Sequence, residues 1–154
     1  MRIHLLSIGR RMPGWIETGY EEYAKRLPPS CALQLHEIEA SRGKGAGKTG
    51  SRSEGARLLA RIPKGAWVVG LDQRGTQRTT EALADWLAHR LAAGQDLALL
   101  IGGPDGLADA CRKRAQELWS LSPLTFPHPL VRVLVAEQLY RAWSYLQGHP
   151  YHRG

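Results

Sequence analysis

Residues Leu97 to Gly106 read LALLIGGPDG, an apolar run of strand length that ends in a glycine-rich turn. Such a run is typical of a strand that helices cover on both faces of a parallel sheet. Glycines let a ligand lie against the main chain, and Pro104 stiffens the turn. Because ligands of parallel α/β sheets bind beyond the carboxyl ends of the strands, this stretch predicts one wall of a site. The same spacing also suits a tight turn without a ligand.

Strands and helices alternate on both sides of this stretch. Apolar runs predict further strands at residues 2–8, 32–39, 66–71 and 117–121. Apolar residues at three-to-four spacing predict helices at 13–27, 54–62, 83–91, 107–116 and 129–146. The pattern therefore predicts one α/β domain over residues 1–154, with a mostly parallel sheet and helices on both faces.

The last predicted helix has two different sides. Val135 and Leu139 belong to an apolar stripe that predicts a core face. Arg132, Glu137 and Arg141 fall on or near the other side. Glu137 and Arg141 are four residues apart, as in a solvated helical ion pair.

Composition limits the class of protein. The chain has 154 residues, 43% hydrophobic and 23% charged, which suits one folded domain. Its net charge of +7 favours contact with a polyanion such as nucleic acid, although it could serve solubility alone. The apolar stretch near the start is too short for a signal peptide or a membrane span. Cys31 and Cys111 lack metal or disulfide spacing, so we expect reduced thiols, no metal and a cytoplasmic location.

A basic segment, residues 41–53, is rich in Gly, Lys, Arg and Ser and predicts a mobile loop. Part of it, RGKGAGKT from Arg42 to Thr49, departs from the Walker A pattern only where Arg42 replaces the first glycine, and Val68 to Asp72 could supply a Walker B strand. Against a P-loop, Gly50 and Ser51 intervene before any apolar periodicity, whereas the Lys and Thr of a P-loop open a helix. We favour an arm that binds RNA phosphates.

Two further segments carry candidate chemistry. SLSPLTFPHP, residues 120–129, holds three prolines and several hydroxyls after a predicted strand, which suits a stiff pocket wall. The tail from His149 to Gly154 reads HPYHRG. A frayed end is the default for such a terminus, but His, Tyr and Arg side chains stack on bases, hold phosphates and move protons. His149 and His152 lack the further ligands of a zinc site.

These segments are similar to one known family. LLIGGPDGL (99–107), WSLSPLTFPHPLVRVLVAEQLYRAWS (119–144) and HPYHR (149–153) resemble the RlmH (YbeA) family of SPOUT methyltransferases, and the resemblance covers nearly the whole chain. Two departures are Asp105, where the family has Glu, and the short, glycine-rich segment 41–53.

The resemblance implies a cytoplasmic homodimer with a deep trefoil knot over about residues 97–154, wrapped around S-adenosylmethionine. Periodicity alone would not suggest a knot, because unknotted connections are the rule. The implied reaction is methylation of N3 of a pseudouridine in 23S ribosomal RNA, on the assembled ribosome. A non-enzymatic RNA-binding or ribosome-associated module, with the glycine loop only a turn, is the alternative.

The resemblance also implies roles for particular residues. The expected cofactor contacts are Leu71, Gly103, Ser122, Pro123, Leu124, Thr125, Phe126 and Pro127. The candidate catalytic residues are His128, Tyr151, His152 and Arg153, and the candidate RNA contacts are Arg42, Lys44, Lys48, Arg52 and Arg141. Because the methyl group arrives activated, the tasks are placement of the base and removal of its imide proton. We expect the tail to hold the base in the partner subunit's pocket, with Arg153 stabilising the anion, while the group that accepts the proton stays open.

Overall fold

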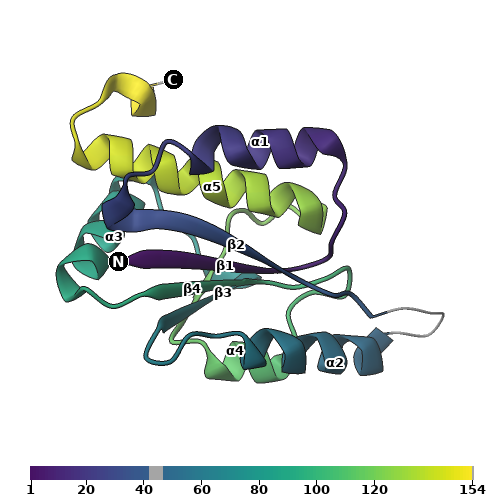
Figure 1. Cartoon of the computed structure of the whole chain (residues 1–154). Coiled ribbons are helices and arrows are strands. Elements are labelled where there is room, and N and C mark those ends of the chain that lie inside the picture. Colours follow the sequence, from purple (N-terminus) through teal and green to yellow (C-terminus); the bar gives the residue numbers. More distant parts are fainter. Residues whose placement is uncertain (42–46, 154) are drawn as a thin grey trace.

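A computed structural model describes residues 1–41 and 47–153 (Figure 1). The strands are β1 (Arg2–Ile8), β2 (Ala32–Ile38), β3 (Trp67–Thr76), β4 (Leu97–Ile101) and β5 (Glu117–Trp119). The helices are α1 (Gly14–Ala24), α2 (Gly47–Ala60), α3 (Thr80–Ala93), α4 (Asp109–Arg114) and α5 (His128–Leu146), with short 3-10 helices η1 (Pro29–Cys31) and η2 (Pro150–Arg153).

The five strands form one parallel sheet in the order β2-β1-β4-β3-β5. Figure 1 shows α1 and α5 side by side on one face of the sheet and α2 and α4 on the other. This arrangement confirms the predicted α/β class. Because all five strands run the same way, the loops that follow β3, β4 and β5 meet at one edge of the sheet.

Each face of the sheet buries its own core. In β1, Ile3 and Leu5 pack with α1, α3 and α5, whereas Leu6 and Ile8 pack with α2 and α4. A strand that is covered on both faces needs apolar residues at successive positions, which explains the continuous runs in β1 and β4. The two cores hold the carboxyl edge of the sheet rigid.

The structure corrects the prediction of a loop over residues 41–53. Helix α2 begins at Gly47, seven residues before the predicted start at Glu54. Tertiary contacts account for the difference, because the Ser41 hydroxyl donates to the Gly50 carbonyl and the Glu54 carboxylate accepts from the Ser41 amide. Residues 42–46 of the basic segment lie outside the described residues.

Strand β3 is longer than the predicted 66–71 and irregular at its end. Leu71 and Thr76 both lie opposite Trp119 of β5, so the intervening residues bulge out of the sheet. A Cβ on Gly75 would lie 2.5 Å from the Leu118 carbonyl carbon, so only glycine fits at the point where β3 returns to its pairing with β5. The bulge carries Asp72, Gln73 and Arg74 beyond the edge of the sheet.

The polar side of α5 is more buried than its spacing predicts. Val135 and Leu139 are buried as expected, but Arg132 is 1% exposed and Ser144 is fully buried as well. Arg132 is buried because its side chain faces the sheet, where it bonds to Glu37 of β2 and Ser7 of β1. The remaining helix and strand predictions are correct to within a few residues.

Candidate functional site

A cavity of about 780 Å³ lies at the carboxyl edge of the sheet. Three segments wall it: the β3 bulge, the glycine loop after β4 and the loop between β5 and α5. Of the predicted cofactor contacts, it is lined by Leu71, Gly103, Ser122, Leu124, Thr125, Phe126 and Pro127. Pro123 does not line it. The volume falls within the range of small-molecule sites, about 300–1,000 Å³.

The glycine loop folds back on itself. The Gly106 amide donates to the Gly103 carbonyl at 2.9 Å, and Gly106 has a φ of +81°. A Cβ on Gly102 would overlap the Gly106 carbonyl oxygen, and a Cβ on Gly103 would lie 2.9 Å from the Glu54 carboxylate. A side chain at Gly103 would therefore point into the protein behind the loop and not into the cavity, and any larger residue would push the loop forward.

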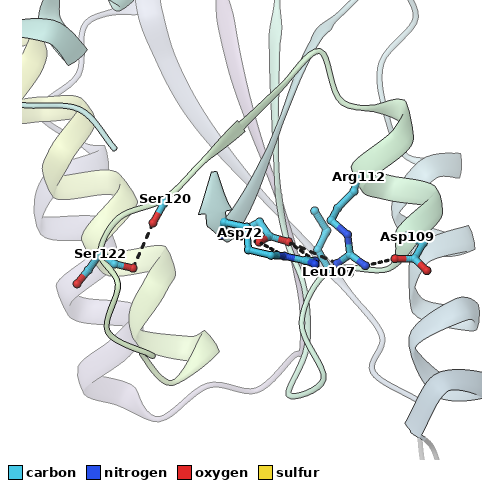
Figure 2. Close-up of polar contacts among 7 residues, drawn as sticks. Asp72, Leu107, Asp109, Arg112, Ser120 and Ser122 are labelled. Atoms are coloured by element: carbon cyan, nitrogen blue, oxygen red, sulfur yellow. Dashed lines mark hydrogen bonds and ion pairs between the residues drawn. The ribbon is translucent and has the colours of Figure 1, made fainter. Parts of the chain in front are cut away.

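A charged cluster that the sequence analysis missed lies beside the end of the glycine loop. The Asp72 carboxylate accepts from the Arg74 amide at 2.8 Å and pairs with the Arg112 guanidinium at 3.4 Å. Figure 2 shows Arg112 of α4 also reaching the Leu107 carbonyl and Asp109. Asp72 and Arg112 are far apart in sequence, so only the fold brings the pair together. Asp72, Arg74 and Arg112 all line the cavity.

The pKa of Asp72 reflects this surrounding. Burial alone would raise the pKa of the carboxyl, but the hydrogen bonds from Arg74 and the charges of Arg74 and Arg112 outweigh it. The net pKa lies below its ordinary value, so Asp72 is an anion at neutral pH. The cavity thus presents a fixed carboxylate that two guanidinium groups hold in place.

The loop between β5 and α5 is held by its own hydroxyl groups. The Ser120 hydroxyl donates to the Ser122 carbonyl at 3.2 Å, as Figure 2 shows, and the Leu124 amide donates to the Ser122 hydroxyl at 3.0 Å. The Gln73 amide group donates to the Thr125 hydroxyl at 2.5 Å, which joins this loop to the β3 bulge across the cavity. The prediction of a stiff wall here is consistent with these bonds.

His128 is the first residue of α5 and lines the cavity. Burial lowers the pKa of its imidazole, and the nearby charge of Arg132 lowers it further, while Glu54 acts in the opposite direction. The net pKa is below the ordinary value. His128 is therefore an uncharged imidazole at neutral pH.

The predicted tail residues do not line the cavity of their own chain. Tyr151, His152 and Arg153 lie in η2, which packs back on the second half of α5, and Tyr151 contacts Glu137, about 14 Å along the helix from His128. Figure 1 shows the two ends of α5 at opposite sides of the molecule.

The tail is packed against α5 and is not the frayed end expected by default. The Tyr151 hydroxyl donates to the Glu137 carboxylate at 2.8 Å, and Arg141 pairs with the same carboxylate at 2.8 Å. The Arg141 guanidinium also lies over the Tyr151 ring, 5.1 Å from its centroid. Burial and the Glu137 carboxylate raise the pKa of Tyr151 above its ordinary value.

The structure describes only some of the predicted RNA contacts. Arg42 and Lys44 lie outside the described residues, and Lys48 falls in the first turn of α2. Arg52 is exposed on the same helix. Arg141 forms the helical ion pair with Glu137 that its spacing predicts.

One argument against the P-loop alternative is wrong, because α2 begins at Gly47 and therefore includes Lys48 and Thr49. The sheet order supplies a better one. β1 and β4 lie between β2 and β3, so the ends of β2 and β3 are about 14 Å apart. Asp72 is thus too far from a phosphate held after β2 to share a magnesium ion with it.

Within residues 1–41 and 47–153, no three His, Cys, Asp or Glu side chains are placed to hold one metal ion. The same part of the chain contains no helix with the length and apolarity needed to cross a membrane.

The geometry defines the class first: a parallel α/β domain whose loops enclose a small-molecule cavity at the carboxyl edge of the sheet. A family model described as "Predicted SPOUT methyltransferase" matches residues 1–152. The chain belongs to this family, as its resemblance to SPOUT methyltransferases predicts.

Several relatives are similar over their whole length. A protein of Thioalkalivibrio sulfidiphilus is 58% identical over 99% of both chains, and one of Methylococcus capsulatus is 55% identical over 99% of this chain and 100% of its own. Both are named ribosomal RNA large subunit methyltransferase H. The solved structure of a probable methylase family protein from Haemophilus influenzae covers 97% of this chain and 69% of its own, with a TM-score of 0.57 and 13% identity, and shares the fold.

Proposed function

We propose that this chain transfers a methyl group from S-adenosylmethionine to N3 of a pseudouridine in 23S ribosomal RNA, as a cytoplasmic homodimer that acts on the assembled ribosome. The observation that carries the proposal is the cavity at the carboxyl edge of the sheet, in a chain whose full-length relatives are named ribosomal RNA large subunit methyltransferases.

The cavity suits S-adenosylmethionine in size and chemistry. Leu71, Leu121 and Phe126 offer an apolar surface to an adenine ring, and Gly102 and Gly103 line the cavity beside them. Asp72 offers a fixed carboxylate to a ligand that carries an ammonium and a sulfonium group. The predicted knot over residues 97–154 would shape these same loops.

When bound, S-adenosylmethionine supplies a methyl group activated by its positive sulfur. The chain then has to bring N3 of the base into line with that methyl group and to remove its proton. His128 lies on the cavity wall and is uncharged at neutral pH, so it is available to accept a proton. A charged imidazole could not act in this way.

The tail is proposed to hold the base in the cavity of the partner subunit. Within one chain the tail packs on α5 at Glu137 and Arg141, about 14 Å or more along the helix from His128, and it does not line the cavity. We therefore propose that the two groups act together across a dimer in which the α5 helices run antiparallel. Arg153 is exposed in η2 and would stabilise the anion that forms on deprotonation.

The net charge of +7 is proposed to attract the RNA backbone. Arg42, Lys44, Lys48, Arg52 and Arg141 are the proposed phosphate contacts.

Two linked measurements test the proposal. Calorimetric titration should show micromolar-range binding of S-adenosylmethionine. Single-turnover assays with methyl-labelled S-adenosylmethionine should then transfer label to ribosomes that lack the modification, and less to free 23S RNA. A folded protein that binds RNA but not S-adenosylmethionine would instead indicate a non-enzymatic RNA-binding module.

A further inference from the structure

Arg132 is the largest fully buried side chain of the described residues, and the proposed reaction gives it no role. It lies on α5 one turn after His128, so the two side chains share one face of the helix. A Cβ placed on Gly9 would lie 3.7 Å from Nε2 of His128 and 4.0 Å from Nη2 of Arg132. The two side chains therefore approach each other beside Gly9, in the turn after β1.

The guanidinium is fixed in this position. It donates to the Glu37 carboxylate at 2.8 Å, to the Ser7 hydroxyl at 3.1 Å and to the Gly9 carbonyl at 3.3 Å. These contacts tie α5 to β1, β2 and the turn after β1. Because the guanidinium cannot move toward solvent, its charge acts on its neighbours at constant distance.

The positive charge of Arg132 is only partly neutralised by its surroundings. The Arg132 side chain is 2% exposed, whereas its carboxylate partner, Glu37, is 34% exposed and so is partly screened by water. The Nε atom of Arg132 is buried without a hydrogen-bond partner among residues 1–41 and 47–153. Burying a guanidinium group costs free energy, and the position of this one beside a candidate proton acceptor calls for a functional explanation.

We infer that Arg132 is a positioning residue that keeps His128 uncharged, so that the His128 imidazole can accept the N3 proton of the RNA base; this inference rests on the proposed function. The position of His128 at the first turn of α5 acts in the same direction, because a helix N-terminus disfavours a cation. The carboxylate that faces His128 from the other side is Glu54 of α2, which favours the charged form. Burial and Arg132 together outweigh it.

In the resulting step the proton of N3 moves to the free ring nitrogen of His128. The electron pair left on N3 forms the bond to the methyl carbon, and the pair of the broken carbon–sulfur bond stays on sulfur. His128 then returns its proton to solvent. A His128 that was charged beforehand would have no electron pair for the proton.

The test measures the pKa of His128 by NMR, with the resonance assigned from its disappearance in His128→Gln. In the parent protein the pKa should lie below that of an ordinary histidine. Arg132→Met, which removes the charge and keeps most of the volume, should raise it. Glu37→Gln is the matched control, because it perturbs the same hydrogen-bond cluster but leaves the cation, and it should not raise the pKa.

Activity provides the second readout. In Arg132→Met, the acidic limb of the pH profile of single-turnover methyl transfer should move to higher pH by the same amount as the His128 pKa. In Arg132→Lys, which keeps the positive charge, the acidic limb should stay near its parental position. If Arg132→Met does not fold, the double variant Arg132→Met with Glu37→Leu removes both charges and avoids a lone carboxylate.

An ordinary or raised His128 pKa in the parent, or an unshifted acidic limb in a folded variant without the cation, would overturn the inference. A parent protein that transfers no methyl group would instead contradict the proposed function, and the NMR titration would still decide the role of Arg132.

Discussion

Gly103 packs against the buried Glu54 carboxylate and leaves no space for a side chain. Replacing it by valine should weaken S-adenosylmethionine binding about tenfold or more, because a Cβ 2.9 Å from Glu54 and 3.3 Å from Ile8 forces the loop forward into the cavity. Calorimetric titration of the folded variant measures the effect. Gly65→Ala is a control for backbone strain, because Gly65 has a φ of +80°, has open space around it and lies away from the cavity. The strain that alanine introduces there should leave S-adenosylmethionine affinity unchanged.

Asp72 should contribute to stability in a pH-dependent way. Its side chain is 8% exposed and its folded-state pKa lies below the unfolded one, so the contribution is present above an unfolded pKa of about 3.9 and disappears as pH falls through the folded pKa. Asp72→Asn should therefore cost about 1–3 kcal/mol at pH 7, and the difference from the parent should shrink below about pH 4.

Urea unfolding across pH measures this difference. Asp109→Asn is the matched control: Asp109 also pairs with Arg112 but is 83% exposed, so its replacement should have a much smaller effect. A constant difference between parent and Asp72→Asn from pH 7 to pH 3 would contradict the assignment.

At the scale of elements, α2 and the segment before it carry four of the five proposed RNA contacts, all except Arg141 of α5. Lys44→Ala with Lys48→Ala should flatten the slope of log affinity against log salt by about one for each RNA phosphate that is no longer neutralised. Filter-binding assays with ribosomal RNA over a range of salt concentrations measure the slope, and S-adenosylmethionine affinity should not change. If the parent hydrolyses ATP and the double variant does not, the P-loop alternative is favoured.

The regular elements could be predicted where the signal is local. β1 and β4 are correct to the residue, because strands buried on both faces are continuous apolar runs. The start of α2 could not be predicted, since Gly, Lys and Ser give no apolar period there and contacts from Ser41 hold that turn. The buried position of Arg132 was missed for a similar reason, because spacing along α5 does not reveal that this side chain turns toward polar groups of β1 and β2.

The candidate site also has parts that local sequence predicts and parts that it does not. Glycines and prolines identify the loops after β4 and β5, because each of these residue types favours turns whatever its neighbours are. The pairing of Asp72 with Arg112 depends on the parallel neighbours β3 and β5 and on α4, and no spacing in the sequence indicates it.

For the whole molecule, the separation of His128 from the tail predicts a shared site between subunits. Deletion of Tyr151 to Gly154 should leave S-adenosylmethionine affinity nearly intact and lower methyl transfer about a hundredfold or more, because a positioning group is removed. Since Tyr151 binds Glu137, thermal melts should accompany the assay, and Tyr151→Phe, which removes the hydroxyl but keeps the ring and the rest of the tail, measures what the hydroxyl contributes to stability.

Mixed dimers distinguish a site shared between subunits from a site within one chain. One subunit carries the tail deletion and the other carries His128→Gln, and sedimentation verifies that they associate. A shared site should recover up to about half of the parental activity, since one complete cavity is restored. Near-normal transfer by the truncated homodimer would show that the tail has no part in the reaction.

The central claim is that this chain methylates a pseudouridine of large-subunit ribosomal RNA. Mass spectrometry of nucleosides from 23S RNA tests it most directly, with RNA from a strain that lacks the gene and from the same strain supplied with the parent or with His128→Gln. The account predicts that N3-methylated pseudouridine is absent without the gene, returns with the parent and is strongly reduced with His128→Gln. An unchanged nucleoside profile in the strain that lacks the gene would contradict it.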